Sequence, residues 1–458
     1  MNVLLTIAGL GILSMLAEML KFKKQLFILV LAGLIGAFAL SFTDWNTGFS
    51  YYHDMVLIDN YAIVFSGLLI VIAFLWLLMS RSYFTSETSA ADHYALILFS
   101  LAGAIVMVNF ADLTMFFIGL EILSISLYVL AGSDKLNIKS NESALKYFMM
   151  GAFATGFLLF GIALIYGVCG TFNLRQIAIY TGQNSASLPV IFYAGIILIL
   201  VGLLFKVAAA PFHFWAPDVY DGAPTVVTAF MATIVKTAAF AAFYRLFSTC
   251  FSSVADWWTP LIAIISAITM LLGNILAVYQ KSLKRMLAYS SIAHAGYILM
   301  AVASLNQTSS GSILLYAAAY SLASIGMFTV LHVVSSSTGN ESITGLKGMS
   351  KSHPFTSVLT SICMLSMAGI PPVAGFFAKY YIFYAALKSD FTWLVLIAVL
   401  SSLIGVYYYF KVIIAMYQPD GKENKTFSFE GLNFLVILLA GILTLAIGIA
   451  PGFMIGLL

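Results

Sequence analysis

Fourteen apolar stretches follow one another along this chain of 458 residues, and each is long enough to cross a lipid bilayer as a helix. The hydrocarbon core of a bilayer is about 30 Å thick, which takes about 20 residues of α-helix. Hydrophobic residues make up 62% of the chain and charged residues only 9%, so most of its outer surface suits lipid. The sequence therefore predicts an all-α polytopic membrane protein.

The predicted spans cover residues 3–20, 26–42, 57–79, 94–110, 113–130, 144–168, 189–216, 225–247, 258–278, 283–303, 311–335, 355–386, 391–417 and 432–457. The first span is not expected to be a cleaved signal peptide, because its positive charges follow the apolar run instead of preceding it.

Basic residues in the connecting loops predict how the chain crosses the membrane. Only Arg175 and Lys388 lie in loops after even-numbered spans. Loops after odd-numbered spans hold Lys21, Lys23, Lys24, Arg81, Lys135, Lys139, Lys281, Lys284, Arg285, Lys347, Lys351, Lys422 and Lys425. Basic loops face the cytoplasm, so we expect both termini on the opposite side of the membrane.

Five ionisable side chains lie near the middle of apolar segments: Glu121, Lys206, Lys236, His294 and Lys379. One charged side chain at the centre of a bilayer costs ~2.5 to 3.5 kcal/mol on insertion scales. Such residues usually face the protein interior or a water-filled cavity and mark ion pathways. We therefore expect these five to be paired, hydrated or functional.

Two spans interrupt the helical pattern with prolines beside a lysine. In the seventh span, Lys206 is followed by VAAAPFHFWAP, and in the twelfth span GIPP precedes Lys379. Proline removes a backbone donor and breaks a helix, and the freed carbonyl groups then need other partners. A lone proline indicates a simple kink. Matching interruptions in two halves are typical of an inverted-repeat transporter fold.

The spans divide into two sets of five with a broken fourth member in each. We expect a single membrane domain, residues 1–458, that contains two inverted five-helix repeats. The first repeat, helices 4 to 8, covers residues 93–250, and the second, helices 9 to 13, covers residues 256–418. Helices 1 to 3 precede them in residues 1–92, and helix 14 follows in residues 430–458.

The sequence lacks the usual marks of a cofactor or nucleic-acid site. Cys169, Cys250 and Cys363 are far apart and show no spacing that would hold a cluster, zinc or haem. The sequence has no dinucleotide-binding or P-loop motif. The net charge of +3 is scattered over short loops, which argues against a nucleic-acid partner. We expect no cofactor and no metal on this chain.

Three segments carry a resemblance to a known family: FKVAAAPFHFWAPDVYDGAPTVVTAF (205–230), KRMLAYSSIAHAGY (284–297) and AGIPPVAGFFAKYYIF (368–383). They resemble the signatures of the antiporter-like membrane subunits of respiratory complex I, the NADH-quinone oxidoreductase, and the resemblance extends over essentially the whole chain. Lys379 agrees with the N and L types, whereas the M type has a glutamate there. The long C-terminal extension of the L type is absent after Leu458, which leaves the N type as the best match.

The resemblance implies a role for each of the five residues named above. Glu121 matches the fifth-helix glutamate that pairs with a seventh-helix lysine, which here is Lys206. Lys236 matches the central lysine of the eighth helix, and His294 resembles a bridging histidine in the tenth. Lys379 matches the twelfth-helix lysine that ends a hydrophilic axis. The family uses such an axis to move protons.

Lys146 is a sixth, less certain candidate. It resembles a sixth-helix lysine of this subunit type, yet Glu142 lies four residues earlier, and that spacing also fits an ordinary ion pair on one helix face.

The resemblance also implies partners and a location. The chain is expected to be a proton-translocating subunit in a bacterial inner membrane, beside an M-type antiporter-like subunit and the small K, J and A-type subunits. NADH, FMN, iron–sulfur clusters and quinone are expected on partner subunits. A subunit of an Mrp-type cation/proton antiporter is the nearest alternative. A solute transporter and a structural scaffold are more distant ones, and the scaffold leaves the buried lysines unexplained.

Overall fold

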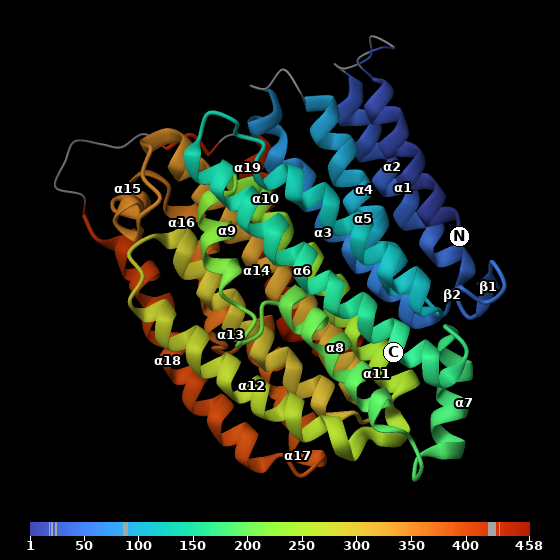
Figure 1. Ribbon diagram of the computed structural model, residues 1–458. Coiled ribbons are helices and arrows are strands. Elements are labelled where there is room, and N and C mark those ends of the chain that lie inside the picture. Colours follow the sequence, from blue (N-terminus) through green and yellow to red (C-terminus); the bar gives the residue numbers. More distant parts are fainter. Residues whose placement is uncertain (18, 20–21, 23–24, 86–89, 420–426, 430) are drawn as a thin grey trace.

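The computed structural model describes residues 1–458 except 18, 20–21, 23–24, 86–89, 420–426 and 430, and the described chain is almost entirely helical (Figure 1). The elements are α1 (Asn2–Leu16), α2 (Leu26–Ser41), β1 (Phe49–Tyr51), β2 (Val56–Ile58), α3 (Asn60–Thr85), α4 (Ala90–Asn109), α5 (Leu113–Ala131), α6 (Ile138–Cys169), α7 (Leu174–Asn184), α8 (Val190–Lys206), α9 (Trp215–Gly222), α10 (Thr225–Phe230), the π-helical segment η3 (Met231–Val235), α11 (Lys236–Cys250), α12 (Ala255–Val278), α13 (Leu283–Ser304), α14 (Ser309–Thr338), α15 (Met349–Ser352), α16 (Pro354–Ala368), α17 (Ala374–Lys388), α18 (Thr392–Tyr417), α19 (Gly431–Ile449) and α20 (Pro451–Ile455).

Each predicted span coincides with one of these helices, or with a series of helices joined across a break. Within the described residues, eleven helical segments are long and apolar enough to cross a membrane. Three shorter apolar helices, α1, α8 and α16, add to these. The prediction of an all-α polytopic membrane protein is therefore confirmed. The number of fourteen crossings stays a prediction.

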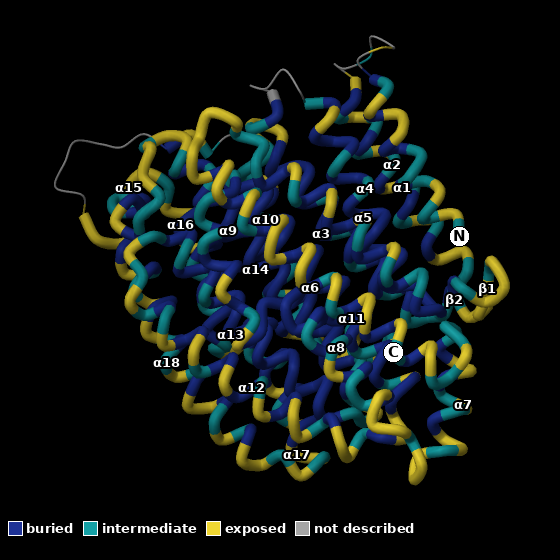
Figure 2. The backbone as a smooth tube through the Cα atoms, viewed as in Figure 1, coloured by how far each residue is buried: buried dark blue, intermediate teal, exposed yellow. Residues whose placement is uncertain are grey.

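The most buried helices lie at the centre of the molecule and carry two of the predicted polar residues, Lys236 and His294. The segments Thr225–Cys250, Leu283–Ser304 and Ser309–Thr338 are almost wholly buried within the chain, whereas Leu26–Asp44 and Gly431–Ile449 bury only about a third of their residues. Figure 2 shows this difference as a dark, buried interior with exposed residues around its edge. The exposed side chains of the outer helices are largely apolar, as expected for surfaces that face lipid or other membrane subunits.

Both predicted helix breaks are present. Helix α8 ends at Lys206, and an irregular stretch leads from there to α9. Helix α16 ends at Ala368, and Gly369 closes it with a left-handed backbone at φ +83°, which a residue with a side chain rarely adopts. Helix α17 then begins at Ala374. Each break frees backbone carbonyl groups inside the molecule.

A third departure from regular helix was not predicted. The eighth span changes from α-helix to π-helix over Met231–Val235 and returns to α-helix at Lys236. The segment MATIV contains neither proline nor glycine, so the sequence gives no local signal for it. Segments of π-helix are rare and often lie at functional sites.

Glycines let helices cross closely in both halves of the chain. A Cβ atom on Gly103 of α4 would lie 2.5 Å from the backbone nitrogen of Leu123 in α5. A Cβ atom on Gly273 of α12 would lie 2.5 Å from the backbone nitrogen of Ala293 in α13. These are the first two helices of each predicted repeat. The inverted relation between the repeats, and the domain limits drawn from it, stay predictions.

Helix α7 and the hairpin of β1 and β2 were also not predicted from the sequence. The hairpin is antiparallel, with Ser50 opposite Leu57. Helix α7 begins after Asn173, whose side chain accepts hydrogen bonds from the backbone nitrogens of Arg175 and Gln176. Both elements lie at the end of the molecule opposite α15 (Figure 1).

The loop at α15 carries two of the predicted cytoplasmic bases, Lys347 and Lys351. Five of the others, Lys21, Lys23, Lys24, Lys422 and Lys425, lie outside the described residues.

Candidate functional site

Lys206 is buried at the break after α8. Its side chain is 5% exposed, and its Nζ donates a hydrogen bond to Ser124 Oγ of α5 at 2.8 Å. The Ser124 hydroxyl in turn donates to the carbonyl oxygen of Leu120 at 2.5 Å. Because Lys206 is the last residue of α8, its amine lies near the helix end whose dipole favours a cation.

A small cavity adjoins the Lys206 amine. It has a volume of about 10 Å³, and its lining includes the polar side chains of Ser124, Tyr128 and Thr155 among apolar residues. That volume is near the minimum for a single water molecule, and the lining supplies the polar partners that a buried water needs.

The predicted ion pair between Glu121 and Lys206 is not formed in this structure. The Lys206 amine bonds to Ser124 instead, one helical turn after Glu121. Glu121 Oε1 is buried and has no hydrogen-bond partner among the described residues. The residue lies at the edge of the exposed face of α5, next to Ile122, so it is only partly enclosed by this chain. The neutral hydroxyl of Ser124 takes the place that the sequence assigns to the carboxylate.

Lys236 opens α11 directly after the π-helical segment. Its side chain is 4% exposed, and its Nζ donates a hydrogen bond to the carbonyl oxygen of Ser291 in the middle of α13. The Ser291 hydroxyl is buried and without a hydrogen-bond partner among the described residues. Lys236 and α13 are therefore in direct contact at the centre of the molecule.

His294 lies on α13, three residues after Ser291, and both of its ring nitrogens are engaged. Nδ1 lies 2.7 Å from the hydroxyl oxygen of Tyr316, and Nε2 lies 2.9 Å from that of Tyr409. The Tyr409 hydroxyl continues to Ser290 Oγ at 2.5 Å. The imidazole is thus the centre of a chain of hydroxyl groups, which can relay protons.

Lys379 lies on α17, and its side chain reaches back across the second break. Its Nζ donates to the carbonyl oxygen of Ala368, the last residue of α16, at 2.8 Å and to Ser402 Oγ at 2.8 Å. Lys379 and His294 line one cavity of about 10 Å³. The structure therefore brings these two predicted residues together.

Lys146 lies apart from the buried residues. Its amine makes ion pairs with Glu142 Oε1 at 2.7 Å and with Asp218 Oδ2 at 2.8 Å, and its side chain is 38% exposed. Burial raises the pKa of the Asp218 carboxyl, but Lys146 and Arg285 outweigh it and hold that pKa below its usual range. This geometry favours the ion-pair interpretation of Lys146.

Four buried groups share one pattern: Lys206, Lys236, His294 and Lys379. They come from α8, α11, α13 and α17. Among the described residues none of them is in an ion pair, and each bonds instead to a neutral oxygen. Amines and imidazole bind and release protons, and hydroxyl groups and single waters carry protons between them. The arrangement suits proton transfer through the interior.

Sequence reasoning missed the oxygen partners of these groups. Ser124, Tyr316, Tyr409 and Ser402 carry no motif, and only helix periodicity relates Ser124 to Glu121. The prediction from sequence also placed Lys284 in a loop, although the structure buries its side chain.

Two broken helices, each with a buried lysine at its break, define an antiporter-like membrane protein. The family model described as NADH:quinone oxidoreductase/Mrp antiporter, TM, matches residues 111–405. NADH-quinone oxidoreductase subunit N from Cytophaga hutchinsonii is 44% identical over 455 residues, which covers 98% of each chain. The chain therefore belongs to the family of NADH-quinone oxidoreductase subunit N.

Solved structures agree with this assignment. A chain of respiratory complex I from Thermus thermophilus with bound aureothin is 31% identical and superposes with a TM-score of 0.83, covering 99% of this chain and 98% of that one. A chain of the Mrp complex from Dietzia sp. is 20% identical, with a TM-score of 0.87 and coverage of 99% and 95%. The second likeness shows the shared fold alone.

Proposed function

We propose that this chain moves protons across the membrane as the N-type subunit of NADH-quinone oxidoreductase. Its family relatives and the solved complex I support this function. In that assembly the chain sits with other membrane subunits. NADH oxidation and quinone reduction take place elsewhere in the complex, and their cofactors lie on other subunits. We propose that this chain itself holds no redox centre and that its neighbours are the M-type and the small K, J and A-type subunits.

The proposed proton path runs through Lys206, Lys236, His294 and Lys379. The observation that carries it is the shared cavity of His294 and Lys379, because this cavity joins two of the predicted groups directly. A second cavity of the size of one water adjoins Lys206. Water fills the remaining gaps between the groups.

Glu121 is proposed to control the release of a proton from Lys206. Its Oε1 atom is buried, has no hydrogen-bond partner in the described part of the chain, and lies one turn from Ser124, which bonds to Lys206 in this structure. Movement of the Lys206 amine between Ser124 and Glu121 changes whether a negative charge stabilises the proton on it. Quinone reduction in neighbouring subunits supplies the signal for this movement.

The chain is a multi-pass membrane protein of the inner membrane. We propose that both termini face the periplasm, on the basis of the loop bases. The Mrp-type antiporter remains the second candidate, but its solved relative supports only the fold.

The test is a measurement of quinone-reductase turnover and of proton pumping in membranes that carry Lys206→Ala. We expect both rates to fall at least tenfold, with normal assembly on a native gel, because the substitution removes a proton carrier from the path. Lys388→Ala is the matched control, since Lys388 is an exposed lysine at the end of α17.

Loss of both rates in an assembled complex supports a coupled proton path through Lys206. Full rates in Lys206→Ala would make this lysine a structural charge and would reopen the scaffold and antiporter alternatives.

A further inference from the structure

Lys284 shares two features with Lys236 and Lys379 of the proposed path: its side chain is buried, and its amine donates a hydrogen bond to a backbone carbonyl group. Its side chain is 4% exposed, although it lies in the first turn of α13, where the helix dipole disfavours a cation. Its Nζ donates a hydrogen bond to the carbonyl oxygen of Ala223 at 2.6 Å. Ala223 is the residue that follows α9, so this carbonyl is freed by the end of α9, before α10 begins at Thr225. Lys379 is held in a similar way by the carbonyl oxygen of Ala368, the last residue of α16.

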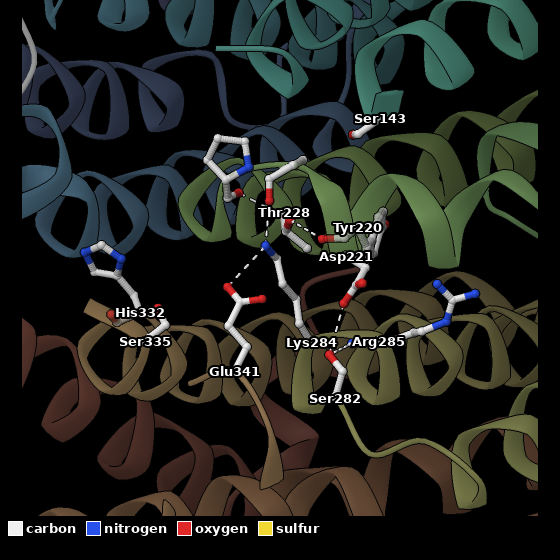
Figure 3. A network of polar contacts seen from close by, with 12 residues as sticks. Ser143, Tyr220, Asp221, Thr228, Ser282, Lys284, Arg285, His332, Ser335 and Glu341 are labelled. Carbon is white, nitrogen blue, oxygen red and sulfur yellow. Dashed lines mark hydrogen bonds and ion pairs between the residues drawn. The ribbon is translucent and has the colours of Figure 1, made fainter. Parts of the chain in front are cut away.

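Glu341 connects the buried Lys284 amine to the solvent. Its Oε1 lies 3.6 Å from Lys284 Nζ, and its side chain is 38% exposed. Figure 3 shows the two side chains pointing toward each other, with the Lys284 amine between the Glu341 carboxylate and the backbone that follows α9. Glu341 is fixed here because Leu283 N donates to its carbonyl oxygen at 2.9 Å. The pair lies at the end of the molecule that carries α15, which we expect to face the cytoplasm.

Polar side chains continue along α13 from this pair to the centre. Ser291 and His294 follow Lys284 at seven and ten residues, so all three lie on nearby faces of the helix. Lys236 bonds to the Ser291 carbonyl, roughly 10 Å along the helix from Lys284 at 1.5 Å per residue.

The gap between Lys284 and Lys236 is not apolar throughout. The Ser291 hydroxyl is buried, and the buried side chain of Tyr220 lies next to it. The Thr228 hydroxyl lies on the same side, where it donates to the Tyr220 carbonyl oxygen at 2.9 Å.

From these contacts we infer that Lys284 and Glu341 form the cytoplasmic inlet of the proton path. The inference rests on the proposed function. In each transfer the Glu341 carboxylate takes a proton from water and passes it to the Lys284 amine. The Lys284 ammonium then releases a proton through hydroxyl groups and water to the Lys236 amine. The net change is one proton moved from the cytoplasmic water to Lys236, and no electrons are involved.

Other charged groups lie near the pair. Asp221 accepts a hydrogen bond from the Ser282 hydroxyl at 3.0 Å and also acts on Lys284 through its charge. Arg285 makes an ion pair with Asp218 at 3.0 Å. Lys139 of α6 also acts on Lys284 through its charge. Of the described side chains, Glu341 is the one in an ion pair with Lys284.

The experiment compares Lys284→Arg, Lys284→Met and Glu341→Gln in the assembled complex. An arginine keeps the positive charge and the contact with Ala223 and Glu341, but it does not release its proton at physiological pH. We expect all three variants to lower coupled quinone-reductase turnover and pumping at least fivefold. The loss should grow as the cytoplasmic pH rises, because protons for the inlet become scarce. Arg285→Gln is the control and should stay within twofold of the native rates.

The Lys284→Arg variant distinguishes proton transfer by Lys284 from a purely structural role of its positive charge. Native rates in an assembled Lys284→Arg complex would overturn the proposal, as would native rates and a native pH profile in Glu341→Gln. If Lys284→Arg does not assemble, the exposed Glu341→Gln decides by the same criterion. Lys236→Met, measured beside them, tests the proposed function separately. If it abolishes pumping while the three inlet variants pump normally, only the inlet is wrong.

Discussion

At the scale of single residues, the buried lysines bond to neutral oxygens. Ser124 holds Lys206, and backbone carbonyl groups hold Lys236 and Lys379. A carboxylate partner would fix each proton more firmly, whereas a hydroxyl or carbonyl group satisfies the hydrogen bond and leaves the proton free to move.

Ser124→Ala tests this distinction at Lys206. The substitution removes the acceptor of the Lys206 amine and leaves a buried polar group unsatisfied, which costs ~1 to 3 kcal/mol. We expect the amine to turn toward Glu121 and turnover to fall several-fold in an assembled complex. Turnover is measured beside Ser126→Ala, whose hydroxyl bonds only within α5, to the Ile122 carbonyl oxygen. Equal rates in the two variants would contradict a role for Ser124.

The sequence predicted several of the charged residues that lie inside, although not Lys284, and it did not predict which groups they contact. Glu121 and Lys206 both lie within apolar segments, and an uncompensated charge in lipid is costly, so both could be expected to face the interior. Their partners depend on how α5 and α8 rotate against each other, and residue spacing does not fix that rotation. The ion pair is not formed in this structure, and the pairing of Glu121 with Lys206 stays a prediction, whereas Lys206 is buried as expected.

At the scale of elements, the two breaks place the lysines. Prolines made both breaks predictable, because a proline cannot continue the hydrogen bonds of a helix. The π-helical segment before Lys236 was not predictable, since it contains neither proline nor glycine and lies in an apolar setting. The helix α7 was missed because it is short and lies between two strongly apolar spans.

Gly375→Ala tests the geometry of the second break. A Cβ atom on Gly375 would lie 1.8 Å from the carbonyl oxygen of Ser366, so α17 would have to move away from α16. Such overpacking costs typically ~1 to 3 kcal/mol and would displace Lys379 from Ala368. We expect turnover to fall at least tenfold or the complex to lose thermal stability.

Gly36→Ala in α2 is the matched control for this variant. A Cβ atom on Gly36 meets nothing within 4 Å, so this variant should be neutral or slightly stabilising. Native turnover and native stability of Gly375→Ala would show that the half-helices do not need their close crossing.

At the scale of the whole molecule, the two ends differ in charge and in structure. The end with α15 carries Lys347 and Lys351, and the other end carries the β1–β2 hairpin and α7 (Figure 1). The positive-inside rule assigns the first end to the cytoplasm. The Lys284–Glu341 inlet then takes protons from the cytoplasmic side, the direction that pumping to the outside requires.

Cysteine labelling checks this orientation. Ser185 and Ser352 are exposed serines at opposite ends of the molecule. In a background in which the half-buried Cys169 is replaced by serine, a membrane-impermeant thiol reagent should label Ser185→Cys in intact cells. Ser352→Cys should react only after the membrane is opened. The reverse pattern would invert the predicted topology and place the Lys284 inlet on the outer side.

The neutral partners of the buried lysines and His294 also limit how much charge the interior can store. Two unit charges about 10 Å apart at an effective dielectric constant of ~20 repel by ~1.7 kcal/mol, which lowers their joint occupancy by more than tenfold. The pathway therefore holds few excess protons at one time. The entry of a proton at one end is favourable when another proton leaves at the other end, so protons pass through the subunit one after another.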